Sequence, residues 1–114
     1  MKICKNNSEH YIWGQQAEGW HLLKTDTLSI IQERMPVGTT ESLHFHHKAQ
    51  QFFFILSGTA TFELEEKTIE VNAQEGLHIK PKQLHKITNK GTVDLNFLVV
   101  SEPLSHGDRT NIDL

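Results

Sequence analysis

Hydrophobic and polar residues alternate along many short stretches of this chain. Across residues 59–65, Ala60, Phe62 and Leu64 fall on one face, and threonines and glutamates fall on the other. Residues i and i+2 of an extended strand point to the same side, so this pattern predicts a half-buried strand. Residues 68–71 alternate in the same way after a short polar turn. The two segments are therefore predicted to form a hairpin.

Further strand patterns are separated by turns rich in glycine, proline and asparagine. They cover residues 20–24, 28–35, 44–47, 50–56, 77–80, 84–88 and 93–100. No segment shows the 3.6-residue period of an amphipathic helix. Short strands at close spacing are typical of an all-β barrel or sandwich, and we predict that fold class.

The chain is long enough, at 114 residues, for one domain with its own core. It contains no internal repeat and no low-complexity linker. We therefore expect a single domain over residues 1–114, with the barrel at about 20–102. A lead-in at 1–19 would precede the barrel, and a polar tail at 103–114 would follow it.

Charge and composition narrow the classes of partner. The net charge is −3 and no basic cluster occurs, which argues against nucleic-acid binding. No apolar run approaches the length of a membrane span. The N-terminus lacks the apolar segment of a secretory signal and Cys4 is the single cysteine, so we expect a cytoplasmic protein without disulfides.

Histidine is the unusual residue, with 8 in the chain. His44 and His46 lie two positions apart, so an extended backbone points both imidazoles to one face. The next strand brings Gln51, and His85 follows a proline turn further along. Convergence of these four side chains inside a barrel would make a metal site, because histidine is the commonest protein ligand for metals.

Two motifs resemble those of the cupin family. In the first, Gly38, His44, His46 and Gly58 match the family spacing, and Gln51 stands where a glutamate is usual.

The second motif is matched by Gly76, Pro81, His85 and Asn89, with Lys82 where a glycine is usual. The similarity covers residues 28–100. It implies a double-stranded β-helix, a small jelly-roll barrel that is often dimeric, with one divalent metal ion held by the motif histidines.

The donor set leaves the identity of the metal open. Three histidines with a neutral amide suit Zn, Fe, Mn, Ni or Cu without a sharp preference. Because Gln51 adds no negative charge, the ion would keep its full charge and favour an anionic substrate. Gln51 has two alternatives: it could hydrogen-bond a metal-bound species through its N–H, or make only protein hydrogen bonds.

Two functions remain open at this stage. One is a metal-dependent enzyme with oxygenase- or isomerase-type chemistry on a small chelating or anionic substrate. The other is a non-catalytic module that binds a sugar-like or anionic small molecule. The expected strand register lines the pocket with apolar side chains, which suits either function. These are Phe53, Ile55, Phe62 and Phe97.

Two sets of charged residues expected near the barrel mouth have more than one possible role. Glu41 could act as a general base, or be a solvated loop carboxylate. The segment from His106 to Arg109 could fold over the mouth and present a cation to an anionic ligand. Its alternative is an exposed ion pair that holds the tail to the surface.

An outward apolar stripe bears on assembly. If Gln51 points inward, Phe52, Phe54 and Leu56 point outward, and exposed apolar patches commonly mark interfaces. We predict a homodimer built partly on this strand. The alternative is that the N-terminal segment, with its tryptophans, covers the stripe.

Overall fold

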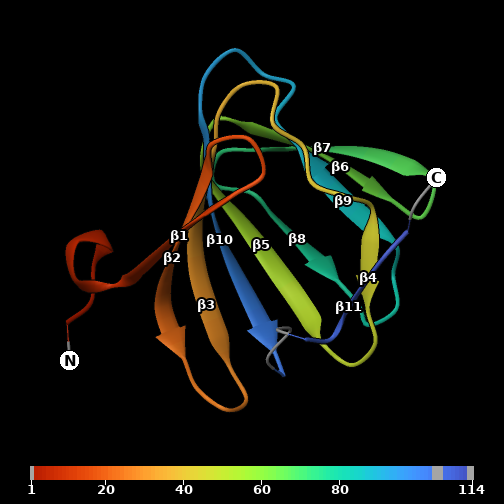
Figure 1. The fold of residues 1–114 in the computed structure, drawn as a ribbon. Helices are drawn as coiled ribbons and strands as arrows, with labels where there is room; N and C mark the ends of the chain where they lie inside the picture. Colours follow the sequence, from red (N-terminus) through yellow and green to blue (C-terminus); the bar gives the residue numbers. More distant parts are fainter. Residues whose placement is uncertain (1, 104–106, 113–114) are drawn as a thin grey trace.

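The computed structural model describes residues 2–103 and 107–112, which form two antiparallel β-sheets that face each other (Figure 1). The strands are β1 (Glu9–Trp13), β2 (Ala17–Lys24), β3 (Ser29–Met35), β4 (His44–His46), β5 (Gln50–Ser57), β6 (Thr59–Leu64), β7 (Lys67–Asn72), β8 (Gly76–Ile79), β9 (His85–Thr88), β10 (Leu95–Glu102) and β11 (Arg109–Asn111). The six-stranded sheet has the order β1-β2-β3-β10-β5-β8, and the five-stranded sheet has the order β11-β4-β9-β6-β7. The all-β prediction is confirmed.

Strand alternation places the core between the sheets. On β5, Gln51, Phe53 and Ile55 are buried, whereas Phe52 is exposed. The hairpin predicted from the sequence forms as β6 and β7, with Phe62 opposite Ile69. Burying one such phenylalanine contributes about 2–3 kcal/mol, so the alternating faces account for much of the fold's stability.

The segment expected to be a lead-in is part of the sheet. β1 pairs with β2 along its whole length, and the chain turns between them at residues 14–16, where Gly14 has φ +57°. The six-stranded sheet therefore includes a strand that precedes the expected start of the barrel near residue 20. The sequence pattern did not predict β1 because an edge strand buries only part of one face, so many of its residues are polar.

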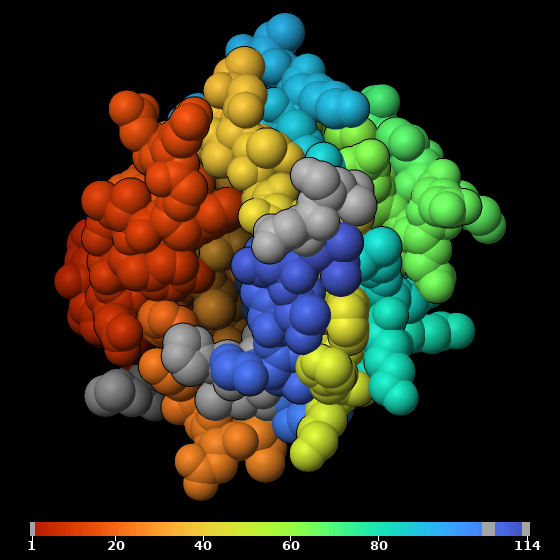
Figure 2. Space-filling model, turned by 45° about the vertical axis from the view of Figure 1, so that its right-hand side comes forward, coloured from red at the N-terminus to blue at the C-terminus, as the bar shows by residue number. Residues whose placement is uncertain are grey.

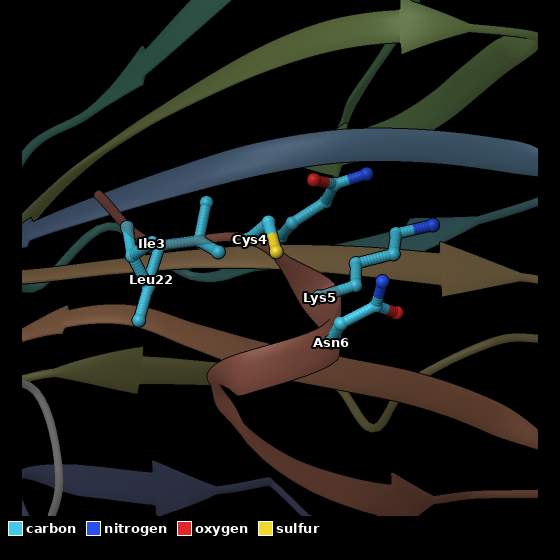
Figure 3. Close-up of a pocket in the computed structure, with 6 residues that line it drawn as sticks. Ile3, Cys4, Lys5, Asn6 and Leu22 are labelled. Carbon is cyan, nitrogen blue, oxygen red and sulfur yellow. The ribbon is translucent and has the colours of Figure 1, made fainter.

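The first residues pack on the outer face of the six-stranded sheet. Lys5–Asn7 forms a 3-10 turn, and Lys5 Nζ lies 4.3 Å from the centroid of the Trp20 ring. Ile3 and its neighbours lie beside Leu22, where they line a surface pocket (Figure 3). Over the described ranges, no helix has the length and hydrophobicity needed to cross a bilayer.

The segment expected to be a tail also contains a strand. β11 pairs with β4 and places Arg109 opposite His46 (Figure 1). Asp108 fastens its start, because its Oδ2 accepts hydrogen bonds from the backbone N–H groups of Lys48 and Ala49, each at 2.9 Å. The expected tail boundary at 103 thus misses an edge strand, and His106 lies outside the described residues.

The turn before β9 carries the residue that departs from the family pattern. Lys82 has φ +69°, in the left-handed region where glycine is the unstrained residue. Its N–H donates a 2.7 Å hydrogen bond to the carbonyl of His46, which ties the turn to β4. The backbone here keeps the conformation that suits glycine, although the side chain is lysine.

Replacing Lys82 by glycine should therefore stabilise the protein. Relief of left-handed strain outweighs the extra entropy of the unfolded chain, for a net gain of about 0.5–1 kcal/mol. Chemical denaturation measures the free energy of unfolding. Lys90→Gly is the matched control, because Lys90 is exposed and its φ is not positive. The control should lose stability, and an equal loss in Lys82→Gly would contradict the account.

Candidate metal centre

Adjacent strands of the five-stranded sheet bring three histidines together. His44 on β4 stands opposite His85 on β9, and their ring centroids are 4.3 Å apart. His46 follows on the same face, with ring centroids 5.1 Å from His44 and 5.9 Å from His85. One nitrogen from each ring can be chosen so that all three lie within 4.8 Å of one another. This is the convergence that the two motifs predict.

Backbone carbonyls orient two of these rings. The Nδ1–H of His44 donates to the carbonyl of Ser42 at 2.8 Å, and that of His85 donates to the carbonyl of Gln83 at 2.9 Å. A carbonyl only accepts, so Nδ1 carries the proton and Nε2 keeps its lone pair. Nε2 of His85 is buried without a hydrogen-bond partner in the described chain. Such an outer hydrogen bond is the usual arrangement around a metal-binding histidine.

Burial keeps the imidazoles neutral. It lowers the pKa of His44 to about 3 and that of His46 to about 4, and the neighbouring His85 adds to both shifts. Burial also lowers the pKa of His85. At neutral pH all three rings are therefore neutral, with one nitrogen free of a proton, which is the form that binds metal ions.

The side chain of Gln51 is buried, and its amide nitrogen and oxygen differ in their hydrogen bonding. The side chain is 8% exposed, and its Nε2 donates a 3.0 Å hydrogen bond to Ser101 Oγ. Oε1 of the same amide is buried and without a hydrogen-bond partner among the described residues. A buried oxygen of this kind costs free energy unless something binds it.

These donors fit a divalent ion. Three neutral imidazoles beside one free carbonyl oxygen match the nitrogen-rich sites of first-row transition metals. The unpartnered Nε2 of His85 and Oε1 of Gln51 would both be satisfied by one ion. His47, the neighbouring histidine, instead lies exposed on the other face and pairs with Thr110 Oγ1 at 2.8 Å.

Glu41 lies behind His44 and is not a solvated loop carboxylate. Its Oε1 accepts the backbone N–H of Ile87 at 3.1 Å and lies 3.9 Å from His44 Nδ1. Its Oε2 lies 3.8 Å from the guanidinium of Arg109. Burial raises the pKa of Glu41 to about 8, although the charge of Arg109 opposes the shift. The carboxyl thus contacts the side of His44 that faces away from Nε2.

Arg109 brings positive charge to the histidines. It stands opposite His46 on β11, and its Nε donates to Asn111 Oδ1 at 2.7 Å. Its charge contributes to the low pKa of all three histidines, so the guanidinium lies within electrostatic reach of the site. Within the segment 106–109, which was expected to present a cation, Arg109 therefore supplies positive charge that acts on the histidines.

Sequence reasoning missed Tyr11 and Glu33. The Tyr11 hydroxyl donates a 2.7 Å hydrogen bond to Glu33 Oε2, and burial raises the pKa of Glu33 to about 7. Alternation along β3 could have found Glu33, because it shares a face with Ile31 and Met35. Nothing local marked Tyr11, whose strand was not anticipated.

The apolar residues expected to line a pocket belong to the packed core. Ile55, Phe62 and Phe97 are 0% exposed and Phe53 is 4% exposed. Of these, Phe53 approaches the centre, with its ring centroid 6.4 Å from that of His85. Side chains without exposed surface reach a ligand only after rearrangement. The surface pocket of Figure 3 lies elsewhere, on the outer face.

Comparison with known proteins supports this architecture. The sequence profile of the Cupin domain matches residues 31–101, which include all three histidines. An uncharacterized protein of Methanocaldococcus jannaschii, MJ1618, is 36% identical over 81 residues. The match covers 70% of this chain and 65% of that protein, so the chain spans less than two thirds of its relative's length.

A second protein is similar to this chain in sequence, and a solved structure is similar to it in fold. The oxalate-binding protein of Thermotoga maritima is 27% identical over 90 residues, which are 75% of this chain and 74% of that protein. The structure of the polyketide cyclase RemF from Streptomyces resistomycificus superposes with a TM-score of 0.86 at 17% identity. The superposition covers 100% of this chain and 86% of that one. At this identity the likeness concerns the fold alone.

Removing either opposed histidine should abolish metal binding. After incubation with a divalent metal and desalting, the wild type should retain about one ion per chain, whereas His44→Ala and His85→Ala should retain almost none. Each variant loses a neutral ligand that the buried site cannot replace. Elemental analysis by mass spectrometry gives the ratio. His47→Ala is the control and should retain the ion. Equal retention in all four proteins would exclude this centre.

Proposed function

This chain belongs to the cupin family, and on that basis we propose that it is a metal-dependent enzyme acting on a small chelating or anionic substrate. The observation that carries the proposal is the juxtaposition of a neutral metal-ligand set with the cation of Arg109. The buried Gln51 oxygen would complete that ligand set. A ligand that is both chelating and anionic would engage both features at once.

The protein's own residues have distinct tasks in this proposal. A divalent ion bound by His44, His46, His85 and Gln51 would supply Lewis-acid polarisation for an isomerase or redox chemistry for an oxygenase. Arg109 would pair with the anionic group of the substrate. Glu41 is a positioning residue, because it lies against both His44 and Arg109.

A non-catalytic binding module is the second candidate. The name of the Thermotoga maritima relative, an oxalate-binding protein, favours it. The tightly packed Phe53, Phe62 and Phe97 favour it too, since they leave little room for a substrate that must move during turnover. Both candidates share the metal and the anion site. They differ in whether a bound acid is chemically changed.

Oxalate, a small chelating dianion, is a suitable probe of the shared site. Isothermal titration of the zinc-bound wild type should detect one oxalate per chain, and Arg109→Gln should bind it at least tenfold more weakly. A charge-assisted hydrogen bond of about 1.5–3 kcal/mol accounts for this loss. Arg34→Gln is the control, because Arg34 pairs with Glu18 and Asp94 on the outer face.

The control variant should bind oxalate like the wild type. If Arg109→Gln bound oxalate as tightly as the wild type, Arg109 would not be the anion site. Incubation of the metal-bound protein with a panel of small acids, followed by mass spectrometry of the acids, separates the two candidates. Conversion of any acid supports the enzyme, and binding without conversion supports the module.

We further infer that two copies of the chain pack through the outer face of the six-stranded sheet. Phe52 is 43% exposed, and Val100 stands beside it on β10. The N-terminal segment packs near Trp20 and Leu22 and leaves Phe52 uncovered, which argues against the alternative of an internal cover. Exposed apolar side chains of this kind are typical of homodimer interfaces.

Phe52→Glu should therefore convert a dimer into a monomer, because a carboxylate cannot be buried unpaired at an apolar interface. Light scattering coupled to gel filtration measures the mass. Ile12→Glu is the control: Ile12 is 69% exposed on β1, at the opposite edge of this sheet from Phe52. It should leave the mass unchanged. A wild type that runs as a monomer at micromolar concentration would refute the interface.

A further inference from the structure

The Tyr11–Glu33 pair is a second polar feature of the interior that the metal centre does not use. Glu33 lies on β3, where its neighbours across the two flanking strands are Gly19 on β2 and Phe97 on β10. The phenol of Tyr11 reaches it from β1 and donates a 2.7 Å hydrogen bond to Oε2.

Gly19 makes this contact possible. A Cβ atom at Gly19 would lie 2.2 Å from Cζ of the Tyr11 ring, so any side chain there would displace the ring. The ring therefore lies flat across β2 and also contacts the imidazole of His21, at 5.0 Å between centroids. Gly19 on β2 and Tyr11 on β1 together therefore allow the hydrogen bond between the phenol and the Glu33 carboxyl group.

The charged residues beside the histidine cluster act electrostatically on this pair. The positive charge of Arg109 acts to lower the pKa of Glu33, and the negative charge of Glu33 acts to raise the pKa of Glu41. Glu33 thus lies within electrostatic reach of both residues. Figure 2 shows the surface hollowed between the N-terminal strands, in red and orange, and β11, in blue. β1 and β11 are the outermost strands of the two sheets on this side.

A purely structural role explains the pair poorly. Burying a carboxyl group costs free energy, and an apolar pair of the same shape would pack between the strands at no such cost. The hydroxyl of Tyr11 is the one hydrogen-bond donor that Glu33 Oε2 has within 2–103 and 107–112. Glu33 therefore retains unused capacity to accept a hydrogen bond from a ligand.

We propose that Glu33, oriented by Tyr11, determines substrate specificity by accepting a hydrogen bond from a hydroxyl group of an acid whose carboxylate pairs with Arg109. The substrate class is then a small hydroxycarboxylic acid. This inference rests on the proposed function, because it takes the anion site at Arg109 as given. Tyr11 is a positioning residue that acts through Glu33.

Succinate and malate test the inference, because they differ by one hydroxyl group. Titration calorimetry on the zinc-bound wild type should show one malate enantiomer binding about tenfold more tightly than succinate. A site built to bind a hydroxyl leaves a buried polar group unpaired when the hydroxyl is missing. Elemental analysis and thermal unfolding of each variant establish that metal content and folding are retained.

The double variant Tyr11→Phe/Glu33→Leu is the decisive one. It removes both partners of the hydrogen bond and so leaves no buried group unpaired. It should bind malate and succinate with equal affinity, close to that of the wild type for succinate. Tyr11→Phe alone should reduce the preference to about threefold, because Glu33 stays but is no longer oriented. Glu63→Gln on β6, whose carboxylate pairs with Lys86, is the control and should keep the full preference.

The outcomes separate this inference from the proposed function. Equal binding of both acids by the wild type would overturn the role of Glu33 and leave the anion site standing. A tenfold preference that persists in the double variant would also overturn it, because the hydroxyl would then be recognised elsewhere. Failure of the wild type to bind either acid would overturn the proposed function, and this inference with it.

Discussion

The rest of the site depends on one constraint: three neutral imidazoles, those of His44, His46 and His85, are buried close together in an interior of low dielectric constant. Their nitrogens cannot all be hydrated there, and His85 Nε2 has no protein partner in the described chain. The pairing of β4 with β9 creates this crowding, and hydrogen bonds to the carbonyls of Ser42 and Gln83 leave the lone pair of Nε2 free on His44 and His85. Such an arrangement is costly without an ion, and favourable with one.

Tyr11 and Arg109 lie on strands outside the part of the chain that carries the histidines. The histidines lie within residues 31–101, which match the Cupin domain, whereas Tyr11 and Arg109 lie outside that range. Both outlying residues sit on strands at sheet edges, β1 and β11. The barrel therefore combines a histidine cluster that could hold a metal ion with edge strands that carry a phenol and a guanidinium. Selectivity for a substrate would then vary with the edge strands and leave the metal ligands unchanged.

The carboxyl groups of Glu41 and Glu33 differ in the number of partners that bind them. Glu41 contacts Arg109, His44 and the backbone of Ile87, so its oxygens already have partners. Glu33 has the Tyr11 hydroxyl, and the charge of Arg109 acts on it without an ion pair between them in the described residues. A carboxyl with fewer partners has more capacity to bind a ligand. On the basis of that difference we propose positioning for Glu41 and recognition for Glu33.

The sequence by itself determined the features that depend on local spacing. Strand alternation predicted the all-β fold and the inward faces of β5 and β6, and the spacing of His44, His46 and His85 predicted their convergence. Tertiary structure decided the features that depend on distant partners. Ser101 Oγ accepts a hydrogen bond from the Gln51 amide 50 residues away, and Glu33 accepts one from Tyr11 22 residues away. A two-residue period says which side of a strand a residue faces, but sheet order sets what it meets there.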